Sequence, residues 1–416
     1  MGKKTAITSA LFQREFFSVL VVVVNAFSWY FPLYLFFQSV LEKLQPSDPT
    51  SLLMMALGVQ AVAAIGAAII GTTLVKKFLS RDKFLAVWML IGIIASTLML
   101  TLETFNMTYI LLVSFLSGFS LGLGFPSCLA YFGDHTTIEN RGLLAGITFF
   151  ASGLCILFIG LIVSFSTLVA GALILAAWRG IGLLLFLLAR SKQGYRKEKP
   201  IEAQYRAVLF DRSFLLYFVP WTMFCVVNFL GVPVEINLFG EDLGSLMPIA
   251  EYGVGGFSAL IGGWFADTVG RKRIIIIGFI MLGIGFAVLG LFPGDVLSWY
   301  LYIIVDGVAW GIFSLMFYLV IWSELAGKRT KEKYYLLGVL PFLIASYIQI
   351  LFTPFATGVE VSAAFSLASF FLFIAVLPLL YAPETMPQKH IELKRLKKFA
   401  DDAKKAKEKY ERKGKG

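Results

Sequence analysis

Residues 244–292 read GSLMPIAEYGVGGFSALIGGWFADTVGRKRIIIIGFIMLGIGFAVLGLF, two apolar blocks around a short charged turn at 267–273. Each block has about 20 residues, the length that a helix needs to cross a hydrocarbon core roughly 30 Å thick. Lipid offers the backbone no hydrogen bonds, so an apolar block of this length must be helical. The stretch therefore predicts two membrane-spanning helices joined by a tight turn.

The rest of the chain repeats this pattern. Of 416 residues, 58% are hydrophobic and 15% are charged, whereas a soluble domain is about 25% charged. The blocks lack the alternating polarity of a β-barrel. We predict an all-α membrane protein with twelve transmembrane helices, at about 16–41, 51–75, 84–103, 108–132, 142–165, 168–190, 212–238, 244–266, 273–292, 299–325, 334–357 and 360–381.

The basic residues predict the orientation. Of 36 lysines and arginines, 34 lie at the two ends of the chain or in connections that follow even-numbered spans. Lys43 lies on the opposite side, and Arg179 lies inside a span. By the positive-inside rule, the even-numbered connections and both termini are cytoplasmic, and we expect a location in the cell membrane. The net charge of +10 thus reflects topology and gives no support for nucleic-acid binding.

The chain divides into two halves. We predict an N-terminal six-helix bundle at 1–190, a cytoplasmic loop at 191–211, a C-terminal six-helix bundle at 212–381 and a basic cytoplasmic tail at 382–416. An offset of 192 residues places Gly71 on Gly263 and Arg141 on Lys333, which suggests two pseudo-symmetric bundles around a central cavity. The tail is either an amphipathic helix on anionic lipid or a solvated segment.

The turn after the eighth span carries a motif. Gly263 allows close helix contact, Asp267 ends the span with an anion, and Gly270 permits a tight turn before Arg271 and Lys272 begin the next helix. This spacing resembles the G-x-x-x-D-x-x-G-R-[RK] signature of the major facilitator superfamily. The resemblance implies a transporter fold in which the charged turn latches neighbouring helices in one conformational state.

Other segments resemble the same family. They are Asp134 with Arg141-Gly142, Ser323-Glu324 with Arg329, and Pro383-Glu384-Thr385, which is similar to a segment of sugar porters. The first half departs from the signature, because Val75 and Phe78 stand where an acid and a glycine belong. The fifth span lacks the G-P-x-x-G-G element that is characteristic of drug/proton antiporters.

The resemblance implies that spans 1, 4, 7 and 10 line the cavity. Candidate residues for binding solute or protons on these spans are Asn25, Trp29, Trp221, Asn228, Asp306 and Trp310. A polar group one turn from an aromatic ring suits an amphipathic organic solute. Hydrogen bonding between helices explains the asparagines equally well, and the tryptophans could serve packing or the membrane interface.

Charged residues inside spans are costly, by about 2.5–3.5 kcal/mol near the membrane centre, and are usually retained for a role or a partner. Arg179, Glu251 and Asp306 are such residues, whereas Glu235 lies near the predicted end of its span and is not selected. A structural partner would account for Arg179, and an outward-open vestibule would hydrate both acids. We expect Asp306 to be the proton carrier, with Glu251 as the alternative.

These features predict a secondary transporter that moves a small organic solute by alternating access and couples its movement to protons. We expect a monomer without catalytic residues, cofactor or metal site. The two histidines, His135 and His390, lie far apart, and the three cysteines have no metal-ligand spacing. A non-transporting sensor or scaffold on a transporter fold, and an intramembrane lipid-modifying protein, are the alternatives.

Overall fold

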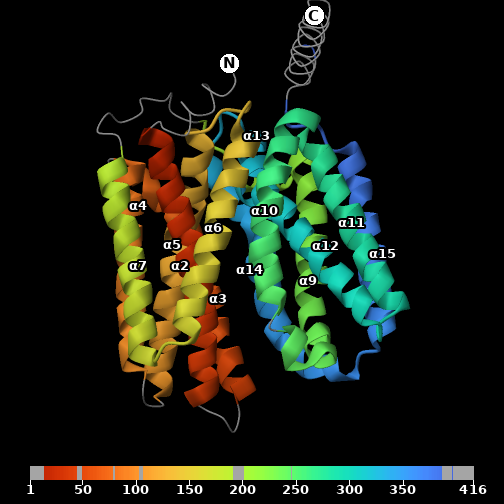
Figure 1. Cartoon of the computed structure of the whole chain (residues 1–416). Coiled ribbons are helices and arrows are strands. Elements are labelled where there is room, and N and C mark those ends of the chain that lie inside the picture. Colours follow the sequence, from red (N-terminus) through yellow and green to blue (C-terminus); the bar gives the residue numbers. More distant parts are fainter. Residues whose placement is uncertain are drawn as a thin grey trace, which may run out of the picture.

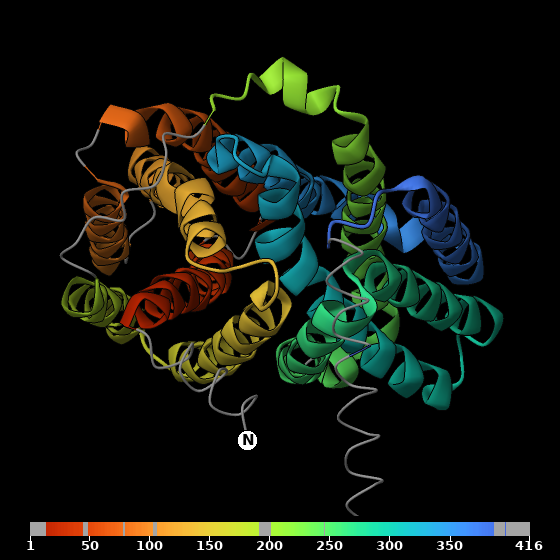
Figure 2. The same cartoon turned by 90° about the horizontal axis from the view of Figure 1, so that it is seen from above.

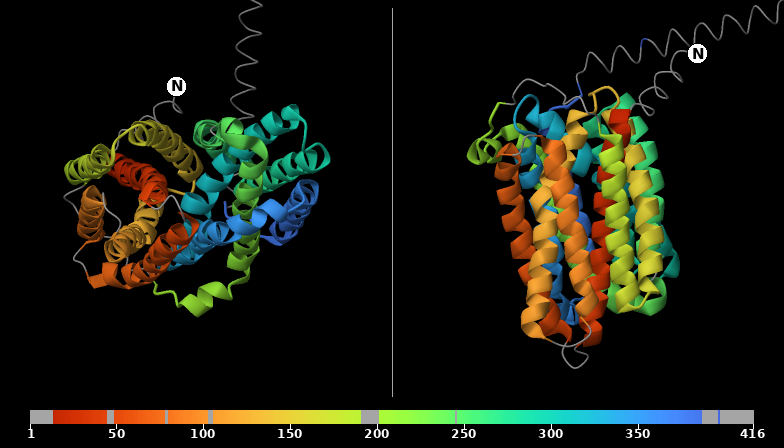
Figure 3. Two further views of the ribbon diagram at one scale, coloured as in Figure 1. Left: turned by 90° about the horizontal axis from the view of Figure 1, so that it is seen from below. Right: turned by 90° about the vertical axis from the view of Figure 1, so that its left-hand side faces the viewer.

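A computed structural model describes residues 14–44, 49–77, 80–102, 106–190, 201–244, 246–386 and 396. These residues form helices that run side by side, with no strand beyond one isolated bridge between Ile201 and Arg329 (Figures 1 and 3). The predicted tail helix lies outside the described residues apart from Leu396, as does the loop at 191–200.

Each predicted span corresponds to a long helix. The first half contains α2 (Arg14–Leu44), α3 (Pro49–Leu74) followed by η1 (Val75–Lys77), α4 (Arg81–Leu98) followed by η2 (Met99–Thr101), α5 (Met107–Asp134), α6 (Arg141–Ser164) and α7 (Leu168–Ala189). The second half contains α9 (Arg212–Gly244), α10 (Leu246–Val269), α11 (Arg271–Leu291), α12 (Val296–Ser314), η3 (Leu315–Val320), α13 (Ile321–Ala326), α14 (Lys331–Phe352), η4 (Thr353–Gly358) and α15 (Val361–Tyr381).

The helices have the length and composition of membrane spans. Eleven stretches among the described residues are long and apolar enough to cross a membrane, and α12, η3 and α13 together make one of them. The remaining long helix, α10, occupies the position of the eighth predicted span. The prediction of an all-α membrane fold is confirmed.

Polar side chains cap the starts of several helices. Asn106 accepts a hydrogen bond from the backbone N–H of Tyr109 at the start of α5, and Asp295 does the same for Leu297 at the start of α12. Glu360 accepts from two backbone N–H groups of α15. Such caps satisfy helix-end donors that have no partner within the helix.

The helices form two groups, α2–α7 and α9–α15, which lie next to each other when the molecule is seen along the helices (Figure 2). Between the groups, α6 packs against α10 and α3 packs against α14. The contact of α6 with α10 is close, because a Cβ atom on Gly146 would lie 2.5 Å from the carbonyl oxygen of Ala259. The short helix α8 (Tyr205–Leu209) lies in the connection between the groups.

Candidate functional site

The connections that follow α3, α5, α10 and α13 meet on one side of the molecule, which we call the charged side. It lies near α13 at the top of Figure 1. There Asp267, at the end of α10, accepts hydrogen bonds from the backbone N–H groups of Gly142 (3.0 Å) and Leu143 (2.9 Å). Arg271 donates to the same carboxylate at 2.6 Å. Asp267 thus caps α6 of the other half, where an anion is favoured by the helix dipole.

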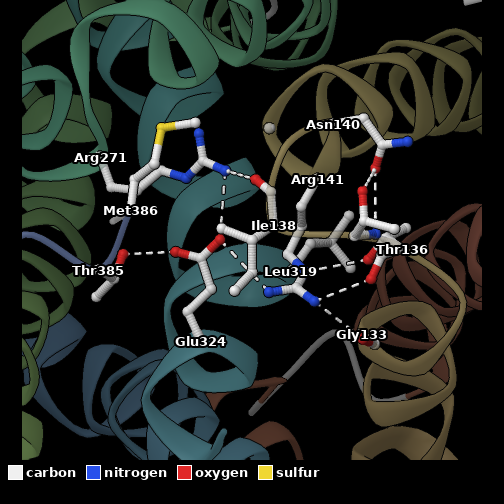
Figure 4. Close-up of polar contacts among 12 residues, drawn as sticks. Gly133, Thr136, Ile138, Asn140, Arg141, Arg271, Leu319, Glu324, Thr385 and Met386 are labelled. Atoms are coloured by element: carbon white, nitrogen blue, oxygen red, sulfur yellow. Dashed lines mark hydrogen bonds and ion pairs between the residues drawn. The ribbon is translucent and has the colours of Figure 1, made fainter. Parts of the chain in front are cut away.

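Glu324 on α13 joins three segments (Figure 4). One of its carboxylate oxygens lies 3.3 Å from Nη2 of Arg271 and 3.4 Å from Nη1 of Arg141, and the other accepts a hydrogen bond from the hydroxyl of Thr385. The side chain of Glu324 is 1% exposed. Removing one member of such a buried cluster leaves an uncompensated charge, so the cluster favours keeping the two halves together on this side.

The turn before α11 adopts the conformation that its glycine predicts. Gly270 has a φ of 117°, a left-handed conformation that side chains disfavour. Glu384 accepts hydrogen bonds from the backbone N–H groups of Arg271 (2.8 Å) and Lys272 (3.2 Å), and Lys272 donates to two carbonyl groups near the end of α15. The segment 383–385 therefore has a local role, which is to cap α11 and contact Glu324.

In the first half, a different set of ion pairs connects the helices on the charged side. Val75 occupies the position of the signature acid and is buried. Arg81, at the start of α4, forms ion pairs with Asp134 of α5 (2.5 Å) and with Glu332 of α14. Lys331 also lies 2.8 Å from Asp134. The ion pairs that Arg81 and Lys331 form with these two carboxylates thus connect α4, α5 and α14, although the signature is incomplete after α3.

A cavity of about 440 Å³ lies between the halves, away from the charged side. Side chains of α2, α6, α9, α10, α12 and α14 line it, together with Tyr318 of η3. Along α14 it reaches from Phe342 to Ile350, close to the end of that helix at Phe352. The volume lies within the range of pockets that hold drug-sized ligands.

Aromatic rings from both halves meet at the end of the cavity that faces the charged side. The ring of Tyr318 lies 5.5 Å from that of Phe27, 5.9 Å from that of Phe149 and 5.5 Å from that of Phe342. Tyr318 belongs to η3, a π-helical segment, and such wider turns often occur at functional sites. These four rings separate the cavity from the ion pairs.

Of the predicted site residues, Asn228 and Trp310 line the cavity. Asp306 is 2% exposed and is not part of the lining. Glu251 belongs to α10, but its side chain lies outside the described part of the chain. The predicted Trp221 is buried, where it donates a hydrogen bond to the carbonyl oxygen of Gly338 and stacks on a neighbouring phenylalanine.

Asn25, Trp29 and Arg179 form a separate cluster inside the first half. Arg179 donates to the Oδ1 atom of Asn25 at 2.8 Å, and its guanidinium lies over the rings of Trp29 (4.7 Å) and Trp88 (4.3 Å). Arg179 is fully buried between α2, α4 and α7. These three candidates therefore lie away from the cavity, and a structural partner accounts for Arg179.

Sequence analysis missed Glu235, which lines the cavity. Its Oε1 atom accepts a hydrogen bond from the hydroxyl of Tyr302 at 2.7 Å. The predicted span ends at 238, whereas α9 continues to Gly244, so Glu235 lies more than two turns from the helix end. The apolar residues around it, and not its distance from the predicted end, were the signal that it belongs inside the span.

Comparisons with known proteins agree with this geometry. The sequence model of the Major Facilitator Superfamily matches residues 18–323. No curated protein sequence matches the chain significantly. Among solved structures, the proton:xylose symporter XylE is similar with 15% identity and a TM-score of 0.68, over 94% of this chain and 99% of that chain.

Two further solved structures are similar. A bacterial homologue of the iron transporter ferroportin, in its outward-facing state, has 12% identity and a TM-score of 0.68, over 89% of this chain and 96% of that chain. The human organic anion transporter MFSD10 has 14% identity and a TM-score of 0.63, over 88% and 98%. At these identities the similarity shows the fold alone.

Proposed function

Because the chain belongs to the major facilitator superfamily, we propose that it is a secondary transporter that moves a small organic solute across the cell membrane by alternating access. The observation that carries the proposal is the cavity between the halves, which the aromatic rings and the ion pairs close on the charged side. We place the charged side in the cytoplasm, so that this conformation exposes the cavity to the outside.

Proton coupling is the second part of the proposal. Glu235 lies in the cavity wall, and a carboxyl whose surroundings change between wet and dry can take up and release a proton. Tyr302 connects it to α12, where Asp306 lies one turn further along the same helix face. We therefore propose Glu235 as the primary proton carrier and keep Asp306 as a second carboxyl close to the path.

Uptake into proteoliposomes tests both parts. Glu235→Gln keeps the size of the side chain but cannot ionise, so it should abolish accumulation driven by a proton gradient and spare counterflow of solute. Glu360→Gln, on the exposed cap of α15, is the matched control and should behave like the parent.

Three results would change the proposal. If Asp306→Asn and not Glu235→Gln abolishes proton-driven uptake, Asp306 is the carrier. If neither change matters, the transporter is not driven by protons through these acids. If no solute from a broad library shows counterflow, a sensor or scaffold on this fold becomes the better explanation.

A further inference from the structure

We infer that the solute is a lipophilic organic monocation, whose charged centre lies in the aromatic cavity near Glu235 and whose apolar substituent extends into a groove beside α2. This inference rests on the proposed function, because it names the class of solute for the same cavity. The charge of the cavity, its rings and its continuity with the groove support it.

The charge of the cavity favours a cation. Glu235 is the one charged side chain in the lining among the described residues, and it is 2% exposed. An anionic solute would enter a mainly apolar space next to a carboxylate, which costs free energy. A cation would instead be attracted by the same carboxylate in the state in which it is ionised. The sign of the charge therefore separates good from poor solutes.

The rings of the cavity add to this preference. Ten of the lining side chains are aromatic, among them Tyr30, Tyr34, Tyr252 and Trp310. The face of an aromatic ring carries partial negative charge and attracts cations, most strongly where water is excluded. Rings also present wide apolar surfaces to a solute. A cation with its own apolar groups satisfies both kinds of contact.

A groove of about 580 Å³ adjoins the cavity and is lined mainly by apolar side chains of α2 and α6. Leu35, Ile156 and Tyr252 belong to both linings, so the two spaces are neighbours with a common wall. Along α2 the groove reaches Lys43, eight residues beyond Leu35, or about 12 Å at 1.5 Å per residue. Lys43 gives the far end a positive charge, so a second positive charge on the substituent is disfavoured there.

The first experiment tests the charge. Tetraphenylphosphonium and tetraphenylborate have the same four phenyl groups and opposite charges. Each is measured by equilibrium dialysis against the purified full-length protein in detergent, with empty micelles as the blank. We expect the cation to bind at least about tenfold more tightly than the anion, and Glu235→Gln to weaken cation binding about tenfold. Glu360→Gln should leave it unchanged.

The second experiment tests the groove. A Cβ atom on Gly160, in the groove wall, would meet no other atom within 4 Å, so Gly160→Trp should add a large side chain to the groove wall without a clash at its Cβ atom. Gly66 on α3 is equally open but lies far from the groove, and Gly66→Trp is the matched control. We expect decyltriphenylphosphonium to bind more tightly than the methyl analogue, and Gly160→Trp alone to reduce that advantage about tenfold.

Several outcomes would overturn the inference. They are equal or tighter binding of the anion, cation binding that ignores Glu235→Gln, and a decyl advantage that survives in Gly160→Trp. Xylose serves as an uncharged test solute that distinguishes a failure of the cation inference from a failure of the transport proposal. If xylose is bound and exchanged while the cation is not, the inference fails and the transporter stands. If the cation binds but no solute is exchanged, the transport proposal fails instead.

Discussion

At the scale of single residues, Asp267 determines how the charged side is closed. Its carboxylate accepts two backbone N–H groups from the start of α6 and one guanidinium N–H from Arg271. These donors come from both halves of the molecule. The residue lies far along α10 from the cavity lining at Tyr252 and Gly256, so we propose that it stabilises the closed state without contacting solute.

We expect Asp267→Asn to slow transport about tenfold and to change equilibrium solute affinity less than about twofold, because it weakens one conformational state and not the cavity. Asp82→Asn, at the start of α4 on the same side, is the control. Counterflow rates and binding isotherms on the same preparations measure the two quantities. A large loss of affinity with unchanged turnover would contradict this role.

Arg179 and Asn25 illustrate a second kind of residue, one that serves the bundle and not the cavity. We expect Asn25→Leu to cost about 3–5 kcal/mol of stability, because it removes a hydrogen bond from a buried charge. Arg179→Met should cost less, about 1–3 kcal/mol, since it removes the buried charge itself, leaves a neutral amide oxygen without a donor and loses the cation–π contacts with Trp29 and Trp88. The double variant should be more stable than Asn25→Leu alone, and unfolding curves in detergent would show it. Strictly additive losses would speak against this pairing.

At the scale of elements, the first half compensates for its incomplete signature through Arg81. This side chain connects the start of α4 to α5 and α14 through two carboxylates, where the second half uses Asp267 instead. A guanidinium can serve two carboxylates at once because its N–H groups diverge in a plane. The two halves thus reach the same closed charged side by different residues.

Removing this connection should open the charged side. We expect Arg81→Gln to raise the rate at which a maleimide labels the buried Cys225 about tenfold, because a loss of about 1.4 kcal/mol shifts a two-state population by that factor. The other two cysteines, Cys128 and Cys155, are replaced by serine in this background, and the exposed Arg273→Gln is the control. Unchanged labelling would show that the ion pairs of Arg81 do not hold the state.

At the scale of the whole molecule, the helix ends before and after the even-numbered connections lie together, and the helix ends before and after the odd-numbered connections lie on the opposite side (Figure 1). The exposed Lys328 follows α13 on the charged side, and the exposed Asp295 precedes α12 at the other end. The positive-inside rule assigns the charged side to the cytoplasm.

This assignment predicts how single cysteines react on intact cells. A membrane-impermeant maleimide should label a cysteine at position 295 and leave one at position 328 unlabelled until the cells are permeabilised. Labelling of position 328 from outside would invert the topology and with it the direction in which the cavity faces.

The helices and the turn that joins α10 to α11 could be predicted from local features of the sequence. A membrane span requires only a continuous apolar stretch, which is a local property, so most span boundaries could be placed within a few residues, although α9 extends six residues beyond its predicted end. The left-handed conformation of Gly270 and the position of Asp267 at the helix end could be predicted in the same way, because residues within the motif form the turn. The sequence also shows that Val75 departs from the family signature, but it does not show that the ion pair of Arg81 with Glu332 compensates for it.

Which side chains line the cavity depends on the packing of distant helices. Asn25 and Arg179 are 154 residues apart, and no local pattern indicates that they meet inside one bundle. Glu235 lines the cavity and Asp306 does not, although both are acids in apolar spans. Successive residues of a helix point about 100° apart, so a residue's place in the sequence leaves its direction open. That direction is fixed by how each helix rotates to pack against its neighbours, which depends on contacts between distant parts of the chain.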